Sequence, residues 1–371
     1  MKCLKAERIS KFEGLNVSSK FAICGMPIRW DSYKTCSFGC EYCFAENRKI
    51  MEYEKTLKVA NLNSLSKRLN RVFDTKDFDE NNLLDKLISN KITWHAGGMS
   101  DPFQPIEGKL NITRDMVDIS SQYDVSILFS TKSDTYHNCN LDPSLHTFQL
   151  SFTNNKDNIM LEPNVAPFEK RVAFYRKLKD EGFKVGLRFQ PLIPGITTPD
   201  ILDSFPDADM VTFEFIKLVP QNEESKRKTL DICNLDSKDF TQKGLLCLKP
   251  EIRYEYIKPF IERAKELGIP YSVSDNDLRY LTNNKCCCGD RLVKRSSMID
   301  TTYMIQTFGK EYPLEYVSKR VDEEGLSDCV CNHLFTSNRT NGCKTVKEFY
   351  NVRFERKASN WGPQYMYYPE Q

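Results

Sequence analysis

The sequence predicts an α/β fold, a partial barrel of roughly six strand–helix units followed by a cysteine-rich C-terminal extension. Short apolar runs typical of buried strands alternate with amphipathic helical stretches, and short connections join them. The chain of 371 residues is long enough for one such barrel and an appendage. The number of units is too small for a closed barrel of eight, so we expect an open one.

The predicted strands are extended and apolar. In chain order they cover Arg29–Tyr33, Ile92–Ala96, Val125–Ser130, His146–Phe152, Lys184–Phe189, Met210–Ile216 and Tyr271–Val273. The predicted helices cover Asn47–Tyr53, Leu62–Phe73, Leu83–Ile88, Thr113–Tyr123, Pro167–Glu181 and Ile252–Leu267, with Asn111 as a candidate cap. This alternation indicates a parallel sheet, and parallel α/β folds gather their chemistry at the carboxyl ends of the strands.

The composition is that of an ordinary globular protein, with 28% charged residues, 40% hydrophobic residues and a net charge of +2. Such a charge argues against wholesale coating of nucleic acid. Residues 1–7 lack the apolar core of a signal peptide and no run reaches membrane-spanning length, so we expect a cytoplasmic protein with no membrane partner. The 14 cysteines indicate metal or redox clusters in a reducing cell, or disulfides outside it.

The most informative stretch is a loop with three cysteines, Cys36, Cys40 and Cys43, at the spacing C-x3-C-x2-C. It follows the first predicted strand and precedes a helix-favouring run. Three thiolates on a short loop can hold three irons of a [4Fe–4S] cluster and leave the fourth iron open for a small molecule. Zinc or unliganded thiols are the alternatives, although zinc normally takes a fourth Cys or His nearby and His95 is distant in sequence.

This spacing, with the aromatic Tyr42 before the last cysteine, resembles the signature of the radical S-adenosylmethionine (SAM) superfamily. The resemblance implies that the open iron chelates the amino and carboxylate groups of SAM. It further implies that one electron from the cluster splits SAM into methionine and a 5′-deoxyadenosyl radical, with a flavodoxin- or ferredoxin-type protein as electron donor. The open partial (β/α)6 barrel is typical of these enzymes.

The loops after the later strands resemble a narrower group, the spore photoproduct lyase-like, DNA repair photolyase-related branch of that superfamily. The matching segments are Ser100–Glu107, Thr113-Arg114, Ser130–Asp134, Glu162–Pro167, Arg171 and Pro191–Gly195. This branch implies radical chemistry on a nucleic acid base. Met99 and Ser100 follow Gly97-Gly98 where many radical SAM enzymes have Gly-Gly-Glu, so contact with the SAM amino group is expected from Ser100 or Asp101.

Four further residues are candidates for cofactor binding. Tyr42, between two of the loop cysteines, is expected beside the adenine. Three others stand at strand ends: Lys132 for a carboxylate of SAM or substrate, Ser151 for the ribose, and Arg188 for the SAM carboxylate. Ordinary loop or packing roles are the alternatives for each of them. Cys139 is a candidate catalytic thiol, because some radical SAM enzymes return a hydrogen atom to the product radical from a cysteine. His95 is expected to be a hydrogen-bonded core residue.

The C-terminal region carries a second group of thiols in a polar context, Cys286-Cys287-Cys288, Cys329, Cys331 and Cys343. Neighbouring side chains diverge in an extended chain, so we take Cys286, Cys329, Cys331 and Cys343 as the ligand set. An auxiliary Fe–S cluster is the first interpretation, with zinc or no metal as alternatives. We therefore divide the chain into a barrel with its N-terminal lead-in at residues 1–275 and a cysteine-rich region at 276–371.

The sequence thus predicts a radical SAM enzyme that acts on a nucleic acid base in repair or modification. The interleaved basic and aromatic residues of the tail at 339–371 suit a nucleic acid strand, and equally a strap that docks on the barrel. Modification of a peptide or small metabolite is the alternative reaction. A non-catalytic metal-binding or regulatory protein is the alternative from another class.

Overall fold

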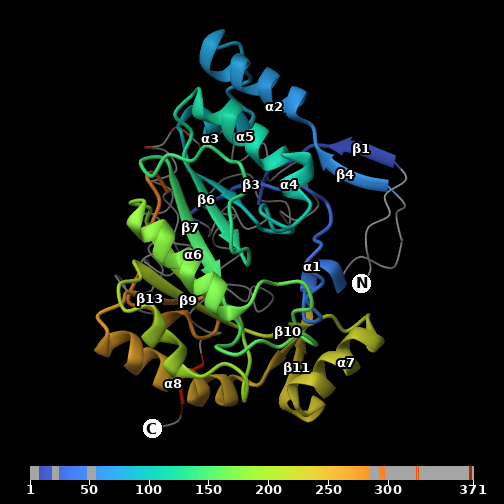
Figure 1. The fold of residues 1–371 in the computed structure, drawn as a ribbon, viewed down its shortest axis with the longest axis vertical. Coiled ribbons are helices and arrows are strands. Elements are labelled where there is room, and N and C mark those ends of the chain that lie inside the picture. The colour runs from blue at the N-terminus through green and yellow to red at the C-terminus, as the bar shows by residue number, and fades with distance from the viewer. Residues whose placement is uncertain are drawn as a thin grey trace.

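The computed structural model describes residues 8–18, 25–47, 56–284, 292–296, 323, 325 and 367–369. At its centre is an eight-stranded sheet in the spatial order β13-β9-β8-β7-β6-β5-β3-β2 (Figure 1). The strands are β2 (Leu15–Val17), β3 (Ile28–Trp30), β5 (Trp94–Ala96), β6 (Ile127–Thr131), β7 (His146–Ser151), β8 (Val185–Leu192), β9 (Met210–Phe215) and β13 (Tyr271–Val273). Every neighbouring pair is parallel except β2 with β3.

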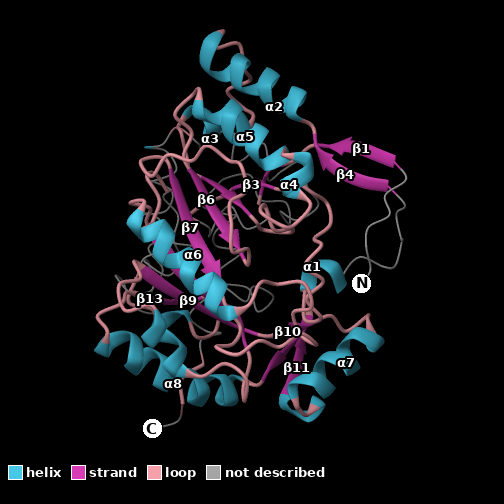
Figure 2. Cartoon of the chain, viewed as in Figure 1, coloured by secondary structure: helices cyan, strands magenta, loops and turns pink. Residues whose placement is uncertain are grey.

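Helices and short helical turns connect the strands and lie around the sheet, as Figure 2 shows. The helices are α1 (Phe44–Asn47), α2 (Leu62–Leu69), α3 (Leu83–Ser89), α4 (Glu107–Leu110), α5 (Ile112–Ser121), α6 (Phe168–Asp180), α7 (Glu223–Cys233) and α8 (Pro250–Glu266). A π-helical turn at Asn70–Asp74 extends α2, and 3₁₀ turns cover Pro199–Ser204, Ser237–Asp239 and Arg279–Leu281. Among the described helices, none is long and apolar enough to cross a membrane.

The central strands are buried on both of their faces. Every residue of β6 and β7 is buried, as parallel strands between two layers require. Aromatic rings fill the space beneath the helices. The ring centres of Phe148 and Phe129 lie 5.7 Å apart, and the Phe148 ring packs edge to face against Phe174 of α6. This packing makes the sheet a rigid base for the loops at its carboxyl edge.

The predicted fold class is confirmed, and all seven predicted parallel strands are present in the predicted order. Two small side sheets were not predicted. One pairs β1 (Arg8–Phe12) with β4 (Thr56–Ala60), and the other joins β10 (Lys217–Leu218), β12 (Leu245–Leu248) and β11 (Phe240–Lys243). Most of the predicted helix Asn47–Tyr53 lies outside the described residues.

Asn111 stands at the predicted cap position of α5, but its side chain does not cap the helix. Asn111 has a left-handed backbone (φ 56°), and its side chain makes no capping hydrogen bond. The carboxylate of Glu107 caps α5 instead, because it accepts hydrogen bonds from the backbone N–H groups of Thr113 and Arg114, both at 3.0 Å.

Residues 292–295 of the C-terminal region pack against the amino-terminal end of the sheet. Leu292 packs with Leu128 of β6 and Met210 of β9, and Thr93 exchanges two hydrogen bonds with Arg295. A Cβ on Gly186 would lie 2.7 Å from the Leu292 side chain, so glycine is required there for the close approach.

Candidate functional site

The cysteine loop, residues 31–43, runs from β3 to α1 and therefore starts at the carboxyl end of a parallel strand, as predicted. Cys36, Cys40 and Cys43 are free thiols of intermediate exposure. Gly39 has φ +65°, a conformation that lets the loop turn between the first two cysteines.

One buried side chain holds the loop around its first cysteine. Gln104, which is fully buried, accepts a hydrogen bond from the Ser37 N–H at 2.6 Å and donates one to the Thr35 carbonyl at 3.0 Å. The two bonds bracket Cys36 and fix the main chain on either side of it. The Cys36 sulfur itself accepts from the backbone N–H groups of Phe38 and Asp101.

The other polar residues of the Ser100–Glu107 segment also connect the loop to the barrel. Ser100 donates from its hydroxyl to the Tyr33 carbonyl at 2.6 Å, and Glu107 accepts a hydrogen bond from the Tyr33 hydroxyl. The Asp101 carboxylate accepts from Thr131 Oγ1 and from the Lys132 N–H, both at 2.7 Å, so it joins the loop after β5 to the end of β6. Ser100, Gln104 and Glu107 of this segment thus help to position the cysteine loop, and contact of Ser100 or Asp101 with SAM stays a prediction.

The opposite side of the loop is held by the segment after β7 and by α7. Asn164 donates from Nδ2 to the carbonyls of Ser37 (3.1 Å) and Phe38 (3.3 Å). The Glu41 N–H donates to the Leu161 carbonyl at 3.0 Å, and the Glu41 carboxylate pairs with Lys228 of α7. The cysteine loop is therefore clamped from two sides before any cofactor binds.

A buried charge cluster lies beside Tyr42 at the ends of β6 and β7. The Glu162 carboxylate accepts from the Tyr42 hydroxyl and from Thr153 Oγ1 (2.8 Å), and it pairs with Lys132 Nζ at 3.0 Å and Arg171 at 3.7 Å. The Lys132 ammonium also donates to the hydroxyls of Ser151 and Thr153, each at 3.3 Å. The structure thus brings three predicted site residues, Tyr42, Lys132 and Ser151, to one place.

Two carboxyl groups near the loop have pKa values shifted in opposite directions. Burial on its own would raise the pKa of Glu162, but the adjacent Lys132 and Arg171 outweigh it and hold the pKa at about 2. Burial raises the pKa of Asp101 to about 6, in spite of the hydrogen bonds that its carboxylate accepts. Burial, followed by the charges of Asp101 and Cys40, raises the pKa of the Cys36 thiol.

Arg188 belongs to a polar row that crosses neighbouring strands of the sheet. His95 Nε2 bonds to Ser130 Oγ at 2.7 Å, and Ser130 donates to Gln149 Oε1 at 3.2 Å. Arg188 Nη1 donates to the same oxygen at 3.1 Å, while its Nε donates to Gln190. Two neutral amides therefore hold the guanidinium, where the sequence predicted an anionic partner.

The remaining predicted thiols lie elsewhere. Cys139 is 5% exposed and packs in the hydrophobic core, and among the described residues it lies near Glu107 and the α5 residues Arg114 and Asp118. Its role as a hydrogen-atom donor stays a prediction. Cys286, Cys329, Cys331 and Cys343 lie outside the described residues.

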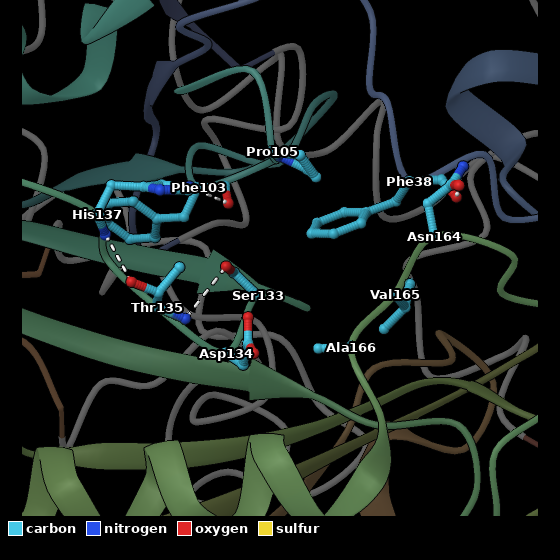
Figure 3. A pocket seen from close by; sticks show the side chains of 10 residues that line it. All are labelled: Phe38, Phe103, Pro105, Ser133, Asp134, Thr135, His137, Asn164, Val165 and Ala166. Atoms are coloured by element: carbon cyan, nitrogen blue, oxygen red, sulfur yellow. Dashed lines mark hydrogen bonds between the residues drawn. The ribbon is translucent and has the colours of Figure 1, made fainter. Parts of the chain in front are cut away.

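Figure 3 shows a pocket of about 400 Å³ next to the cysteine loop. Its walls come from the segments that follow β3, β5, β6 and β7. The lining residues are Phe38, Phe103, Pro105, Ser133, Asp134, Thr135, His137, Asn164, Val165 and Ala166. The Phe38 ring projects into the space, with Ser133 and Asp134 across from it.

The donor set of the loop fits a [4Fe–4S] cluster with one open iron. Three thiols from one loop, none of them in a disulfide, can each ligate a separate iron. The hydrogen bonds that hold the main chain of this loop restrict where its three thiols can lie. Within the described ranges, no three His, Cys, Asp or Glu side chains converge as the ligands of a single metal ion.

No protein-family model matches the chain, and no curated protein matches it in sequence. Among solved structures, it is similar to a spore photoproduct lyase mutant, with a TM-score of 0.52 and 15% identity over 72% of this chain and 82% of that one. Another mutant of that lyase, with bound AdoMet and dinucleoside spore photoproduct, gives a TM-score of 0.50 at the same identity and coverage. SuiB from Streptococcus suis, bound to precursor peptide SuiA, gives 0.42 at 11% identity over 68% and 50% of the chains.

The chain thus has the partial-barrel fold found in radical SAM enzymes. More narrowly, it has the fold of spore photoproduct lyase, which confirms the predicted resemblance at the level of fold.

Proposed function

We propose that this protein is a radical SAM enzyme. The observation that carries the proposal is the clamped loop, which places Cys36, Cys40 and Cys43, none of them in a disulfide, at the carboxyl edge of the parallel sheet. When bound there, a [4Fe–4S] cluster supplies the electron that splits SAM into methionine and a 5′-deoxyadenosyl radical. A flavodoxin- or ferredoxin-type protein is the electron donor that such a site requires.

The residues beside the loop are suited to bind SAM. Lys132 shares the single Glu162 carboxylate with Arg171, at 3.0 Å and 3.7 Å, so Lys132 belongs to a cluster with an excess of positive charge. Its ammonium group can therefore attract the SAM carboxylate, and the Ser151 hydroxyl lies within its hydrogen-bonding reach. Lys132 Nζ also lies 5.4 Å from the centre of the Tyr42 ring, which keeps the two side chains together.

The proposed substrate is a base in a nucleic acid, and the reaction is its repair or modification. The solved spore photoproduct lyase with the same fold carries a dinucleoside lesion together with AdoMet. In this chain, loops after β3, β5, β6 and β7 enclose a pocket beside the cysteine loop, where a base and the cofactor can approach one another. A peptide or small metabolite is the competing substrate class.

Anaerobic reconstitution with iron and sulfide, followed by SAM and a strong reductant, tests the reaction. The wild-type protein should form 5′-deoxyadenosine, and the variant with Cys36, Cys40 and Cys43 all changed to Ala should form none. Deuterium transfer into 5′-deoxyadenosine from deuterated oligonucleotides, compared with deuterated peptides, identifies the substrate class. Wild-type turnover by the triple variant would exclude the proposal.

A further inference from the structure

The pocket beside the cysteine loop contains an acidic group that the residues assigned so far do not use. Asp134 is partly buried in the pocket wall, and no described residue pairs with its carboxylate. Its neighbour Ser133 accepts a hydrogen bond from the Thr135 N–H at 3.2 Å, which shapes the turn that presents Asp134. A carboxylate partly removed from water is stabilised by N–H donors, so the pocket calls for a ligand that supplies them.

The rest of the pocket is mainly apolar. Phe38, Pro105, Val165 and Ala166 line it on the side of the cysteine loop and α6, and the fully buried Phe103 backs it (Figure 3). Two contacts make these walls rigid. His137 Nε2 bonds to the Phe103 carbonyl at 3.0 Å, and Asn164 Nδ2 bonds to the Phe38 carbonyl at 3.3 Å.

We propose that this pocket binds a guanine base of the substrate, with Asp134 accepting from the guanine N1–H and 2-amino group. These two N–H groups point the same way and match the two oxygens of a carboxylate, while the apolar walls contact the ring. Adenine, cytosine and thymine do not offer this pair of donors on one edge. The inference rests on the proposed nucleic acid substrate and adds a preference for guanine near the reacting base.

An arginine side chain of a peptide also presents paired N–H groups, but it suits the pocket less well. Its plane is small and its stem is flexible, so it would leave much of the apolar wall uncovered. A purine with its sugar is of a size to occupy about 400 Å³. The geometry therefore favours the base, and arginine becomes an outcome of the test.

Equilibrium dialysis of the full-length protein with guanosine, inosine, adenosine and arginine amide tests the inference without any turnover. Guanosine should bind tightest. Inosine lacks the 2-amino group and should bind roughly 10-fold more weakly or worse, as expected for one lost hydrogen bond to a charged group. Asp134→Asn should bind guanosine roughly 10- to 100-fold more weakly, because its amide places an NH₂ against a ligand N–H.

The same variant should gain affinity for xanthosine, whose N1–H and 2-oxo group complement an amide. This gain of function cannot come from misfolding. Asp180→Asn, an exposed change on α6, is the matched control and should bind like wild type.

Equal binding of guanosine and inosine, no effect of Asp134→Asn, or a preference for arginine amide would each overturn the guanine site. SAM cleavage is measured separately. If the enzyme cleaves SAM but binds no guanosine, only the guanine site is overturned. If it binds guanosine but does not cleave SAM, only the proposed function is overturned.

Discussion

Gln104 is bonded to the main chain on both sides of Cys36, through the Ser37 N–H at 2.6 Å and the Thr35 carbonyl at 3.0 Å. Gln104→Ala leaves both backbone groups without their partner in a buried site, a cost of roughly 1–3 kcal/mol for each group. We expect the variant to fold but to incorporate less iron and to give an altered electron paramagnetic resonance spectrum after reduction.

Gln104→Glu keeps the acceptor for Ser37 and loses the donor to Thr35, so its iron content should be intermediate. Gln122→Ala on the exposed face next to α5 is the matched control. Wild-type iron content and spectrum in Gln104→Ala would show that the clamp is not needed to position Cys36.

This clamp shows what the sequence could and could not predict. The strands and the cysteine loop depend on local spacing and apolar runs, so they were predicted in the correct order. Ser37 and Gln104 are 67 positions apart, and only the folded sheet brings them together. Asn111 was taken as a cap from its residue type, although the Glu107 carboxylate, only six residues before Thr113, caps the helix from outside it. The resemblance of the Ser100–Glu107 segment to the spore photoproduct lyase-like branch was the available sequence signal for Gln104. That resemblance could not distinguish residues that position the cysteine loop from residues that bind the cofactor.

The charge cluster at Glu162 makes stability dependent on pH. The folded-state pKa of about 2 lies below the ordinary 4.5, so the ionised carboxylate stabilises the fold. That contribution is fully present above about pH 4.5 and is lost as the pH falls toward 2. Glu162→Gln should therefore be less stable than wild type at pH 7 by roughly 3–5 kcal/mol, because Lys132 and Arg171 lose their partner.

The measurement is urea unfolding of both proteins from pH 7 to pH 3, with the exposed Glu169→Gln as control. The difference in the free energy of unfolding should shrink as the pH falls. A difference that stays constant would mean that Glu162 is not ionised in the fold.

Arg188 is proposed to bind the carboxylate of SAM. Gln149 and Gln190 occupy its Nη1 and Nε, and no described residue bonds to its Nη2, which is left to contact a ligand. Arg188→Ala should weaken SAM binding by roughly 1.5–3 kcal/mol, the value of a hydrogen bond to a charged group, with unchanged iron content. Arg176→Ala on the exposed face of α6 serves as control. Equal SAM affinities by calorimetry for Arg188→Ala and the control would place the carboxylate elsewhere.

Variants of Asp101 and Lys132 provide a comparison within the same experiment. Asp101 holds two strand-end segments together, so Asp101→Asn should reduce iron content as well as SAM affinity. Lys132→Met should reduce SAM affinity with unchanged iron content. If neither variant changes SAM affinity, the binding site for the methionyl end of SAM lies away from these residues.

The C-terminal cysteines are proposed to hold a second metal centre, an auxiliary Fe–S cluster or zinc. Thiolate ligation adds folding free energy to loop-rich segments, so the metal should protect this region from proteolysis. The variant lacking Cys36, Cys40 and Cys43 should still contain metal by elemental analysis, and changing Cys286, Cys329, Cys331 and Cys343 to Ala should remove it. Absence of both iron and zinc from the first variant, prepared with adequate supplies of each, would leave these cysteines without a metal role.

The most direct test of the central claim is 5′-deoxyadenosine formation by single cysteine variants under anaerobic, reducing conditions. Cys40→Ala should form none, since each of the three thiols ligates its own iron. Cys247→Ala, a free thiol of similar exposure in β12, should match the wild-type protein. Formation of 5′-deoxyadenosine by Cys40→Ala at the wild-type rate would contradict the assignment of the loop as a radical SAM site.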